Sequence, residues 1–246
     1  MIKRTLRRLL LPLSFKLERV KIIQTIIVAK KAKTYLEIGV DQGKVFEIIH
    51  GPFKIGVDPV APAKKVQKVL DQKNIYFQKT SDDFFRVDAP VILQDKKIDV
   101  AFIDGLHEYT QVLRDIENTL HYLADDGIIL IHDCNPWSRA SAIRALSFDK
   151  AIEIAKRDQY SDWDGGWTGD VWKSIAHLRK HNSNLDIFVL DCDCGIGVIR
   201  KTSKSRRVPD IKDVASLTYD DLALNRTEFL NLKEAPYFFE FLKEIN

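Results

Sequence analysis

The sequence predicts an α/β fold in which a largely parallel sheet carries helices on both faces. Short apolar runs alternate along residues 34–133 with segments of helical periodicity or polar composition. The strand candidates are Thr34–Ile38, Lys54–Asp58, Ile75–Gln78, Asp99–Ile103 and Gly127–His132. This strand–helix–strand spacing is typical of right-handed βαβ crossovers, which make consecutive strands parallel.

The helical segments and the chain length indicate one main domain with two flanking segments. Between His107 and Leu123, apolar residues such as Val112 and Ile116 mark one helix face. The 246 residues contain 45% hydrophobic and 30% charged residues, which suits a single folded domain. We expect an N-terminal helical segment over residues 1–30, the main domain over 31–202, and a C-terminal helical extension over 203–246 that packs on it.

Charge and cysteine content exclude several classes of protein. Lys plus Arg number 38 and Asp plus Glu number 35, so the net charge of +3 gives no support for a nucleic-acid binder. Three cysteines are too few for a disulfide scaffold and favour the reducing cytoplasm. No run of 18 apolar residues occurs, so no transmembrane helix is expected.

The N-terminus carries Lys3, Arg4, Arg7 and Arg8 before a short apolar run, Leu9–Leu13. This run is too short for the core of a signal peptide. Two interpretations remain: an amphipathic helix packed on the domain, or a basic segment that makes weak peripheral contact with anionic lipid.

The first predicted strand ends in a glycine-containing turn. Glu37, Gly39 and Gly43 form the pattern E-x-G-x-x-x-G. Glycine permits positive φ and lets a ligand approach the backbone closely, although a tight turn without a ligand would use the same residues. The pattern lacks the G-x-G-x-x-G of a dinucleotide site, and no phosphate-binding G-x-x-x-x-G-K-[ST] occurs.

Polar residues also follow the second and third strands. Asp58 either accepts hydrogen bonds from the two hydroxyls of a ribose or begins the turn before Pro59. Ser81 and Asp82 either cap the next helix or reach an adenine edge.

The fourth and fifth strands each deliver a carboxylate at their carboxyl ends, Asp104 and Asp133. If the strands are neighbours, the two carboxylates meet and repel, unless one is protonated or a cation such as Mg²⁺ lies between them. The alternative is a pair of helix caps or turns. His107, three residues beyond Asp104, is a candidate general base. Strand alternation should turn the rival His132 away from Asp133.

These residues resemble a family, the class I S-adenosylmethionine-dependent methyltransferases, and within it a small-molecule or sugar O-methyltransferase branch with D-G-x-H-x-Y and H-D motifs. The matching stretches are Tyr35–Gly43, Gly56–Pro59, Asp99–Tyr109 and Gly127–Asp133. The resemblance implies a Rossmann-like, seven-stranded, mostly parallel sheet with one antiparallel strand, which Asp186–Arg200 would help to close. It also implies S-adenosylmethionine as cofactor, with the methionine part beside Glu37, Gly39 and Gly43, the ribose on Asp58, the adenine near Ser81 and Asp82, and Asp104 close by.

The resemblance implies a metal site as well. Metal-dependent members use two Asp and one Asn, and here Asp104 and Asp133 match. Cys134 stands where the Asn is expected, so the adjacent Asn135 is the candidate third ligand of Mg²⁺ or Mn²⁺. His107 stands where those enzymes place a catalytic lysine.

A segment rich in Trp and Gly is expected to bind the substrate. Trp163 and Trp167 flank Gly165 and Gly166, as in a mobile lid with an apolar face, and Asp170 either contacts substrate or caps the next helix. The expected activity is O-methylation of a hydroxyl on a small-molecule or glycan-type substrate. The alternatives are hydroxylation or oxidation on the same scaffold, or a cofactor-binding or interaction module. Cys192 and Cys194 alone supply half a zinc site, so no metal is predicted there.

Overall fold

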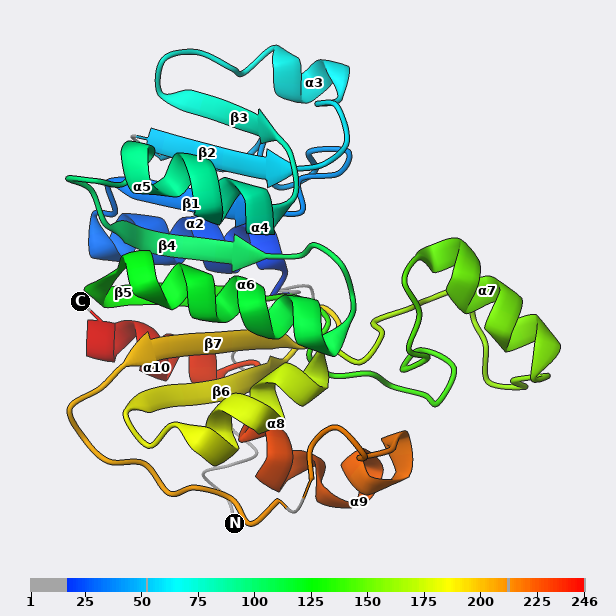
Figure 1. Ribbon diagram of the computed structural model, residues 1–246. Coiled ribbons are helices and arrows are strands. Elements are labelled where there is room, and N and C mark those ends of the chain that lie inside the picture. The colour runs from blue at the N-terminus through cyan, green and yellow to red at the C-terminus, as the bar shows by residue number, and fades with distance from the viewer. Residues whose placement is uncertain (1–16, 52, 212, 246) are drawn as a thin grey trace, which may run out of the picture.

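The computed structural model describes residues 17–51, 53–211 and 213–245, which form one sheet between two layers of helices (Figure 1). The sheet has eight strands in the order β3-β2-β1-β4-β5-β7-β6-β8. β7 is antiparallel to both of its neighbours, β5 and β6, and the remaining pairs are parallel. The predicted Rossmann-like fold is therefore confirmed, with one short strand, β8, added at the edge.

The strands follow the apolar runs of the sequence. Their bounds are β1 Thr34–Ile38, β2 Phe53–Asp58, β3 Asn74–Gln78, β4 Ile98–Ile103, β5 Leu123–Ile131, β6 Leu185–Asp191, β7 Ile196–Lys201 and β8 Leu232–Glu234. All five residues of β1 are buried, because helices cover both faces of the sheet. Its side chains alternate between the two core layers, with Leu36 and Ile38 in one and Tyr35 in the other.

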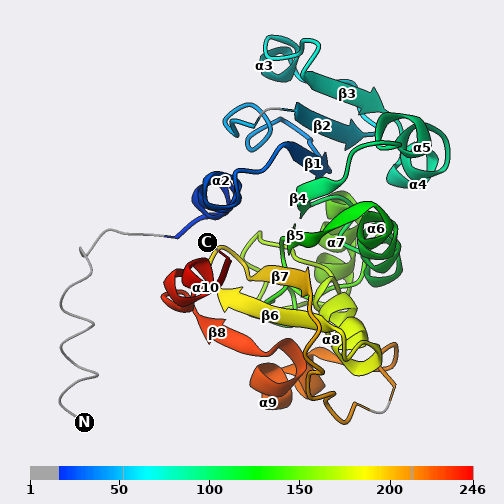
Figure 2. The ribbon, with the colours of Figure 1, turned by 90° about the vertical axis from the view of Figure 1, so that its left-hand side faces the viewer.

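Two sets of helices complete the layers (Figure 2). α2 and α10 cover one face, and their Ile22, Ile26, Phe238 and Phe241 are buried there. α6 and α8 cover the other face, together with the short elements α4, η1 and α5. The helix bounds are α2 Arg19–Lys30, α3 Lys64–Gln67, α4 Ser81–Asp83, η1 Phe84–Asp88, α5 Ala89–Ile92, α6 Tyr109–Tyr122, α7 Phe148–Arg157, α8 Trp172–His181, α9 Tyr219–Leu230 and α10 Tyr237–Ile245.

The predicted helix His107–Leu123 is α6, shortened at both ends. Glu108 precedes it and accepts hydrogen bonds from the backbone N–H groups of Thr110 and Gln111, so the helix begins at Tyr109. Leu123 already pairs with Ile98 in the sheet. The expected C-terminal helical extension contains α10, in which Phe238 and Phe241 are buried.

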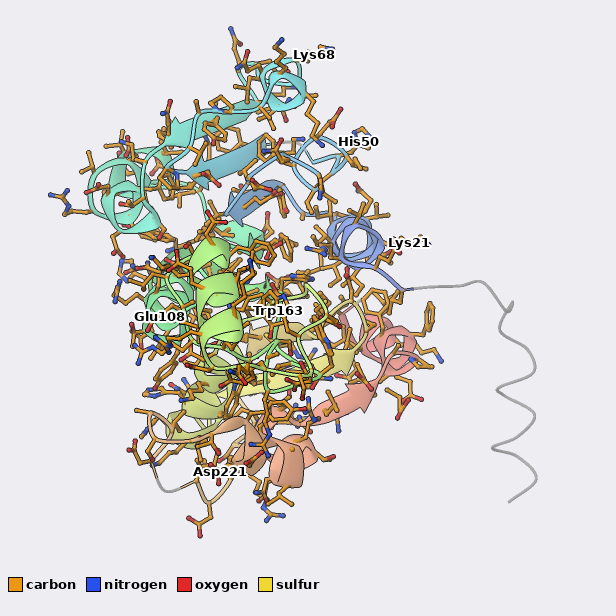
Figure 3. The ribbon with its side chains drawn as sticks, turned by 90° about the vertical axis from the view of Figure 1, so that its right-hand side faces the viewer. Lys21, His50, Lys68, Glu108, Trp163 and Asp221 are labelled. Carbon is orange, nitrogen blue, oxygen red and sulfur yellow. The ribbon has the colours of Figure 1, made fainter. Side chains whose placement is uncertain are left out.

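The segment between β5 and α8 extends beyond the carboxyl ends of the parallel strands and carries α7 (Figure 1). Figure 3 views this end of the molecule, with Glu108 and Trp163 labelled. The basic residues Lys3, Arg4, Arg7 and Arg8 lie outside the described residues. Within the described part of the chain, no helix is both long enough and apolar enough to cross a membrane.

Candidate functional site

A cleft of about 890 Å³ lies at the carboxyl ends of β1, β4 and β5. This is where ligands bind in open α/β sheets. Its lining combines the glycine turn, the two predicted carboxylates, the start of α2, the β6–β7 turn and the segment around α7. The lining residues that matter here are Arg19, Glu37, Gly39, Asp41, Asp104, His107, His132, Asp133, Trp137, Phe148, Trp167, Asp193 and Cys194.

The turn after β1 brings two backbones into close contact. Gly39 has φ 83°, and a Cβ there would lie 2.2 Å from the carbonyl oxygen of Asp104. Gly43 has φ 72°, and a Cβ there would meet Val66 at 2.1 Å. Both glycines are therefore required by the turn itself, whether or not a ligand is bound.

Glu37 lies at the floor of the cleft and is fully buried. Burial raises the pKa of its carboxyl to about 8, although the Tyr35 hydroxyl donates a hydrogen bond to it at 2.7 Å. A protonated Glu37 presents a hydrogen-bond donor as well as acceptors to a ligand in the cleft.

The remaining predicted cofactor residues lie outside the residues that line this cleft. The carboxylate of Asp58 accepts hydrogen bonds from the backbone N–H groups of Asp41 and Val60, at 2.9 and 2.8 Å. The Ser81 hydroxyl donates to Asp115 at 2.6 Å, and the partly exposed Asp82 faces Arg114. These bonds shape the loops after β2 and β3, and they leave each Asp58 oxygen with a further acceptor site.

The two predicted carboxylates converge as expected, and two histidines lie against them. His107 Nε2 is 3.1 Å from Asp133 and 3.6 Å from Asp104. His132 Nδ1 is 3.0 Å from Asp133 and 3.3 Å from Asp104. Convergence follows from the register, because β4 and β5 pair directly and end at the same edge.

The prediction that His132 turns away from Asp133 is wrong. Strand alternation ends at Ile131, and Asp133 has φ 61°, in the left-handed region. That turn brings two consecutive side chains to the same side. Local alternation therefore does not apply here.

The charges of this cluster shift one another's pKa values. Burial disfavours the charged Asp104, but hydrogen bonds from His107 and His132 outweigh it and hold the pKa of Asp104 well below its usual range. Burial likewise disfavours a charged His132, and hydrogen bonds to Asp104 and Asp133 raise its pKa to about 12. The pKa of His107 is raised by the same two carboxylates against burial.

Two residues of the cluster were missed by the sequence reasoning. Arg19, the first residue of α2, pairs with Asp104 at 3.0 Å and with Asp193 at 3.1 Å. Asp193 lies in the turn between β6 and β7 and also accepts from the backbone N–H of Arg19 at 2.7 Å. No sequence pattern pointed to this pair, because Arg19 falls inside the expected helical segment 1–30 and Asp193 stands between Cys192 and Cys194.

The predicted third metal ligand is not brought to the carboxylates. The amide nitrogen of Asn135 donates to Asp191 at 2.9 Å, and its oxygen accepts from Arg226. Asn135 thus faces a neighbouring hollow that Arg226 and Asp191 also line. His107 lies beside the two carboxylates instead, and one ligand atom from each of Asp104, His107 and Asp133 lies within 4.8 Å of the others.

The donor set fits a divalent cation. Two carboxylates and an imidazole are the ligands that Mn²⁺, Fe²⁺ or Zn²⁺ accept, while Mg²⁺ prefers oxygen alone. Within residues 17–51, 53–211 and 213–245, His107 Nδ1 is buried without a hydrogen-bond partner, so no contact there fixes the ring proton on Nδ1. Arg19 and the two histidines neutralise the carboxylates when no cation is bound.

Aromatic side chains form one wall of the cleft. The Trp167 ring lies 4.8 Å from the His107 ring, and its Nε1 donates to the Ile143 carbonyl. Trp137 and Phe148 line the same wall and are partly exposed. Trp163 is not among the lining residues and packs 6.2 Å from Phe148.

Asp170 is buried and does not line the cleft. Its carboxylate accepts a hydrogen bond from the backbone N–H of Tyr109 at 2.7 Å, so it stabilises the start of α6. The helix that it was expected to cap, α8, has Val171 at its N-cap position. The structure thus gives Asp170 a role in positioning the loop that carries His107.

Comparison with known proteins indicates what this domain is similar to. Residues 36–134 match a family model described as a methyltransferase domain. This part of the chain is similar to methyltransferase domains. It runs from β1 to the turn after β5 and so includes the glycine turn, Asp104, His107 and Asp133.

Solved structures share the fold of this chain. A putative caffeoyl-CoA O-methyltransferase from Staphylococcus aureus aligns with 15% identity and a TM-score of 0.52, covering 81% of this chain and 90% of its own. A protein from Corynebacterium glutamicum aligns with 12% identity and a TM-score of 0.50, covering 83% and 89%. A search of curated proteins returns no significant match. Arg19, Asp193 and the aromatic wall lie outside the part that matches the family model.

Proposed function

We propose that this methyltransferase transfers the methyl group of S-adenosylmethionine to a hydroxyl of a small-molecule or glycan-type substrate. The observation that carries the proposal is the continuous cleft from the glycine turn of β1 to the Asp104–His107–Asp133 cluster. A cofactor held by the turn would direct its methyl group toward that cluster. Glu37, Gly39, Gly43, Asp58, Ser81, Asp82 and Asp104 are the proposed cofactor contacts.

The reaction needs orientation and one proton transfer. A C–O bond forms as the C–S bond breaks, and the sulfur leaves with the electron pair as S-adenosylhomocysteine. The cleft orients the two reactants in line and excludes water. The hydroxyl proton passes to His107 Nε2, the ring nitrogen that faces the carboxylates.

Asp104 and Asp133 would hold a divalent cation, Mg²⁺ or Mn²⁺, next to His107. When bound, such an ion lowers the pKa of a coordinated hydroxyl. The same carboxylates raise the pKa of His107, so neutralising their charge returns that imidazole toward its ordinary value. If His107 instead binds the cation, another group must accept the proton. The rate of a His107→Ala variant distinguishes these two roles.

Two features support a substrate with a ring and neighbouring hydroxyls. Trp137, Phe148 and Trp167 offer apolar faces on which a sugar or an aromatic ring packs. Two adjacent hydroxyls could chelate an ion shared by Asp104 and Asp133. Catechols and sugars with vicinal diols are therefore the substrates to test first.

The experiment is methyl transfer from radiolabelled S-adenosylmethionine to a panel of diols, with and without EDTA. Label should enter an ether, stop in chelator and return with Mg²⁺ or Mn²⁺. Full activity in EDTA would show that the reaction needs no cation, but it would leave the proposed methyl transfer intact. The absence of transfer to any hydroxyl, with transfer to an amine or carbon instead, would overturn O-methylation.

The cellular setting is part of the same proposal. Cys134, Cys192 and Cys194 are all free thiols, which suits a reducing cytoplasm. We also propose that the chain divides into residues 1–30, 31–202 and 203–246, which truncation would test. We propose further that the basic N-terminus makes weak contact with membranes, which vesicle binding would test.

A further inference from the structure

A second group of ligand atoms lies on the far side of the His132 ring. His132, Asp193 and Cys194 each offer one ligand atom, and these atoms lie within 4.8 Å of one another. His132 Nε2 is 3.6 Å from Asp193 Oδ1. In a tetrahedral zinc site with ligand bonds of about 2.0–2.3 Å, neighbouring ligand atoms are roughly 3.3–3.8 Å apart.

The His132 ring has the orientation of a metal ligand. Its Nδ1 faces the carboxylates of Asp133 and Asp104, at 3.0 and 3.3 Å. Its Nε2 is buried and has no hydrogen-bond partner among the residues that the structure describes, and the residue is only 5% exposed. A carboxylate on one ring nitrogen with the other left free is the usual arrangement of a metal-binding histidine.

The turn between β6 and β7 holds the other two ligands in place. Asp193 and Cys194 have φ 45° and 62°, so the turn is left-handed at both positions. The backbone N–H groups of Cys134 and Asn135 donate to the carbonyls of Gly195 and Cys194, at 3.0 and 2.9 Å. These bonds fasten the turn to the segment that follows His132.

We propose that His132 Nε2, the Asp193 carboxylate and the Cys194 thiolate bind one divalent ion of the zinc class. Thiolate and imidazole favour Zn²⁺ over Mg²⁺. All three residues line the cleft, so a ligand in the cleft could complete the coordination of the ion. Three protein ligands with one open position are typical of a catalytic rather than a purely structural zinc site. This site goes beyond the proposed function, because it uses the opposite nitrogen of His132 and neither Asp104 nor Asp133 as a ligand.

Arg19 competes with a metal ion for the carboxylate of Asp193. Its backbone N–H and Nε donate to Asp193 Oδ2, while Nη2 lies 3.3 Å from Oδ1. An ion on Oδ1 therefore has to displace only the weakest of these contacts. Removing the guanidinium in an Arg19→Met variant should strengthen metal binding.

The test is Co²⁺ titration of the full chain, kept reduced with a phosphine and followed by absorption. A cobalt–thiolate bond gives a charge-transfer band in the near ultraviolet. We expect that band to saturate at one equivalent, to disappear on adding Zn²⁺ and to persist in excess Mg²⁺. The band should be lost in Cys194→Ser and kept in the matched control Cys192→Ser, which alters the same turn two residues away.

Further variants and outcomes make the result decisive. His132→Gln and Asp193→Asn should weaken Co²⁺ binding by roughly tenfold or more. The absence of the band, or an unchanged band in Cys194→Ser, would overturn the site, as would Co²⁺ that binds with no thiolate signal. If Cys194→Ser fails to fold, X-ray absorption of the zinc-loaded native chain should show one sulfur at about 2.3 Å, and its absence would be equally decisive. None of these readouts depends on methyl transfer.

Discussion

His132 Nδ1 lies 3.0 Å from the carboxylate of Asp133, although the two residues are consecutive in the chain. The contact exists because Asp133 has φ 61° and turns its side chain back toward the strand. Asp and Asn adopt this left-handed conformation more readily than other side chains. An Asp at position 133 therefore supplies a carboxylate to the cluster and also favours the left-handed turn.

The backbone part of this role can be measured separately from the charge. Asp133→Ala and Asp133→Asn both remove the carboxylate, but alanine is the poorer residue at positive φ. We expect Asp133→Ala to be less stable to denaturant than Asp133→Asn by about 1 kcal/mol. Equal stabilities would show that the left-handed turn does not constrain this position.

The close approach of Gly39 to Asp104 predicts a second matched pair of variants. A Cβ at Gly39 would lie 2.2 Å from the Asp104 carbonyl oxygen, whereas a Cβ at Gly165 meets nothing within 4 Å at a similar φ of 91°. Gly39→Ala should displace the Asp104 loop and reduce the affinity for S-adenosylhomocysteine at least tenfold. Gly165→Ala should change that affinity by no more than a few-fold. Similar losses in both variants would show that strain at positive φ, rather than the Asp104 contact, is responsible.

The proposed role of His107 predicts a loss of rate without loss of cofactor. His107→Ala should lower kcat by roughly 10²–10⁴ and leave S-adenosylhomocysteine binding unchanged. The parent rate should fall as His107 protonates at acid pH, and this acid limb should be absent in the variant. The exposed His121 on α6 supplies the control, His121→Ala. A His107→Ala rate within a few-fold of the parent, with the same acid limb, would mean that the proton leaves by another route.

The buried Asp115 lies away from the cleft, and its pKa predicts how the stability of the protein depends on pH. Burial raises the pKa of its carboxyl to about 6, against hydrogen bonds from Ser81 and Gln111. The folded state thus holds a proton that the unfolded chain has released, and the free energy of unfolding should fall as pH rises from about 4 to 6. A shift of this size corresponds to about 2–3 kcal/mol.

Asp115→Asn should remove this decrease while keeping the side chain's shape. Urea unfolding between pH 4 and 8, on the native chain and the variant, measures the difference. A native profile that is no steeper than that of Asp115→Asn would contradict the prediction.

The sheet and the two strand-end carboxylates of the site, Asp104 and Asp133, were predictable from the sequence for local reasons. Strands such as β1 and β4 are mostly apolar, and a carboxylate at the end of each of two adjacent parallel strands must reach the same edge. The rest of the site depends on tertiary contacts that leave no local pattern in the sequence. Asn135 is held by Arg226, a residue of α9 far away in the sequence.

Arg19 illustrates the same limit. The N-terminal segment was expected either to pack on the domain or to contact anionic lipid, yet the Arg19 side chain reaches Asp104 and Asp193 in the cleft. Asp193 stands in a hairpin turn, where an Asp is ordinary. Only the antiparallel pairing of β7 beside β5 brings that turn to His132.

The measurement that tests the central claim most directly is calorimetric titration of the native chain with S-adenosylhomocysteine and, separately, with NAD. We expect one equivalent of S-adenosylhomocysteine to bind and NAD to give no heat of binding. Asp58→Ala removes hydrogen bonds to a charged group, worth about 1.5–3 kcal/mol, and should weaken S-adenosylhomocysteine roughly ten-fold to more than a hundred-fold. Binding of NAD in place of S-adenosylhomocysteine, or an affinity for S-adenosylhomocysteine that Asp58→Ala leaves unchanged, would contradict the assignment of the cofactor and its site.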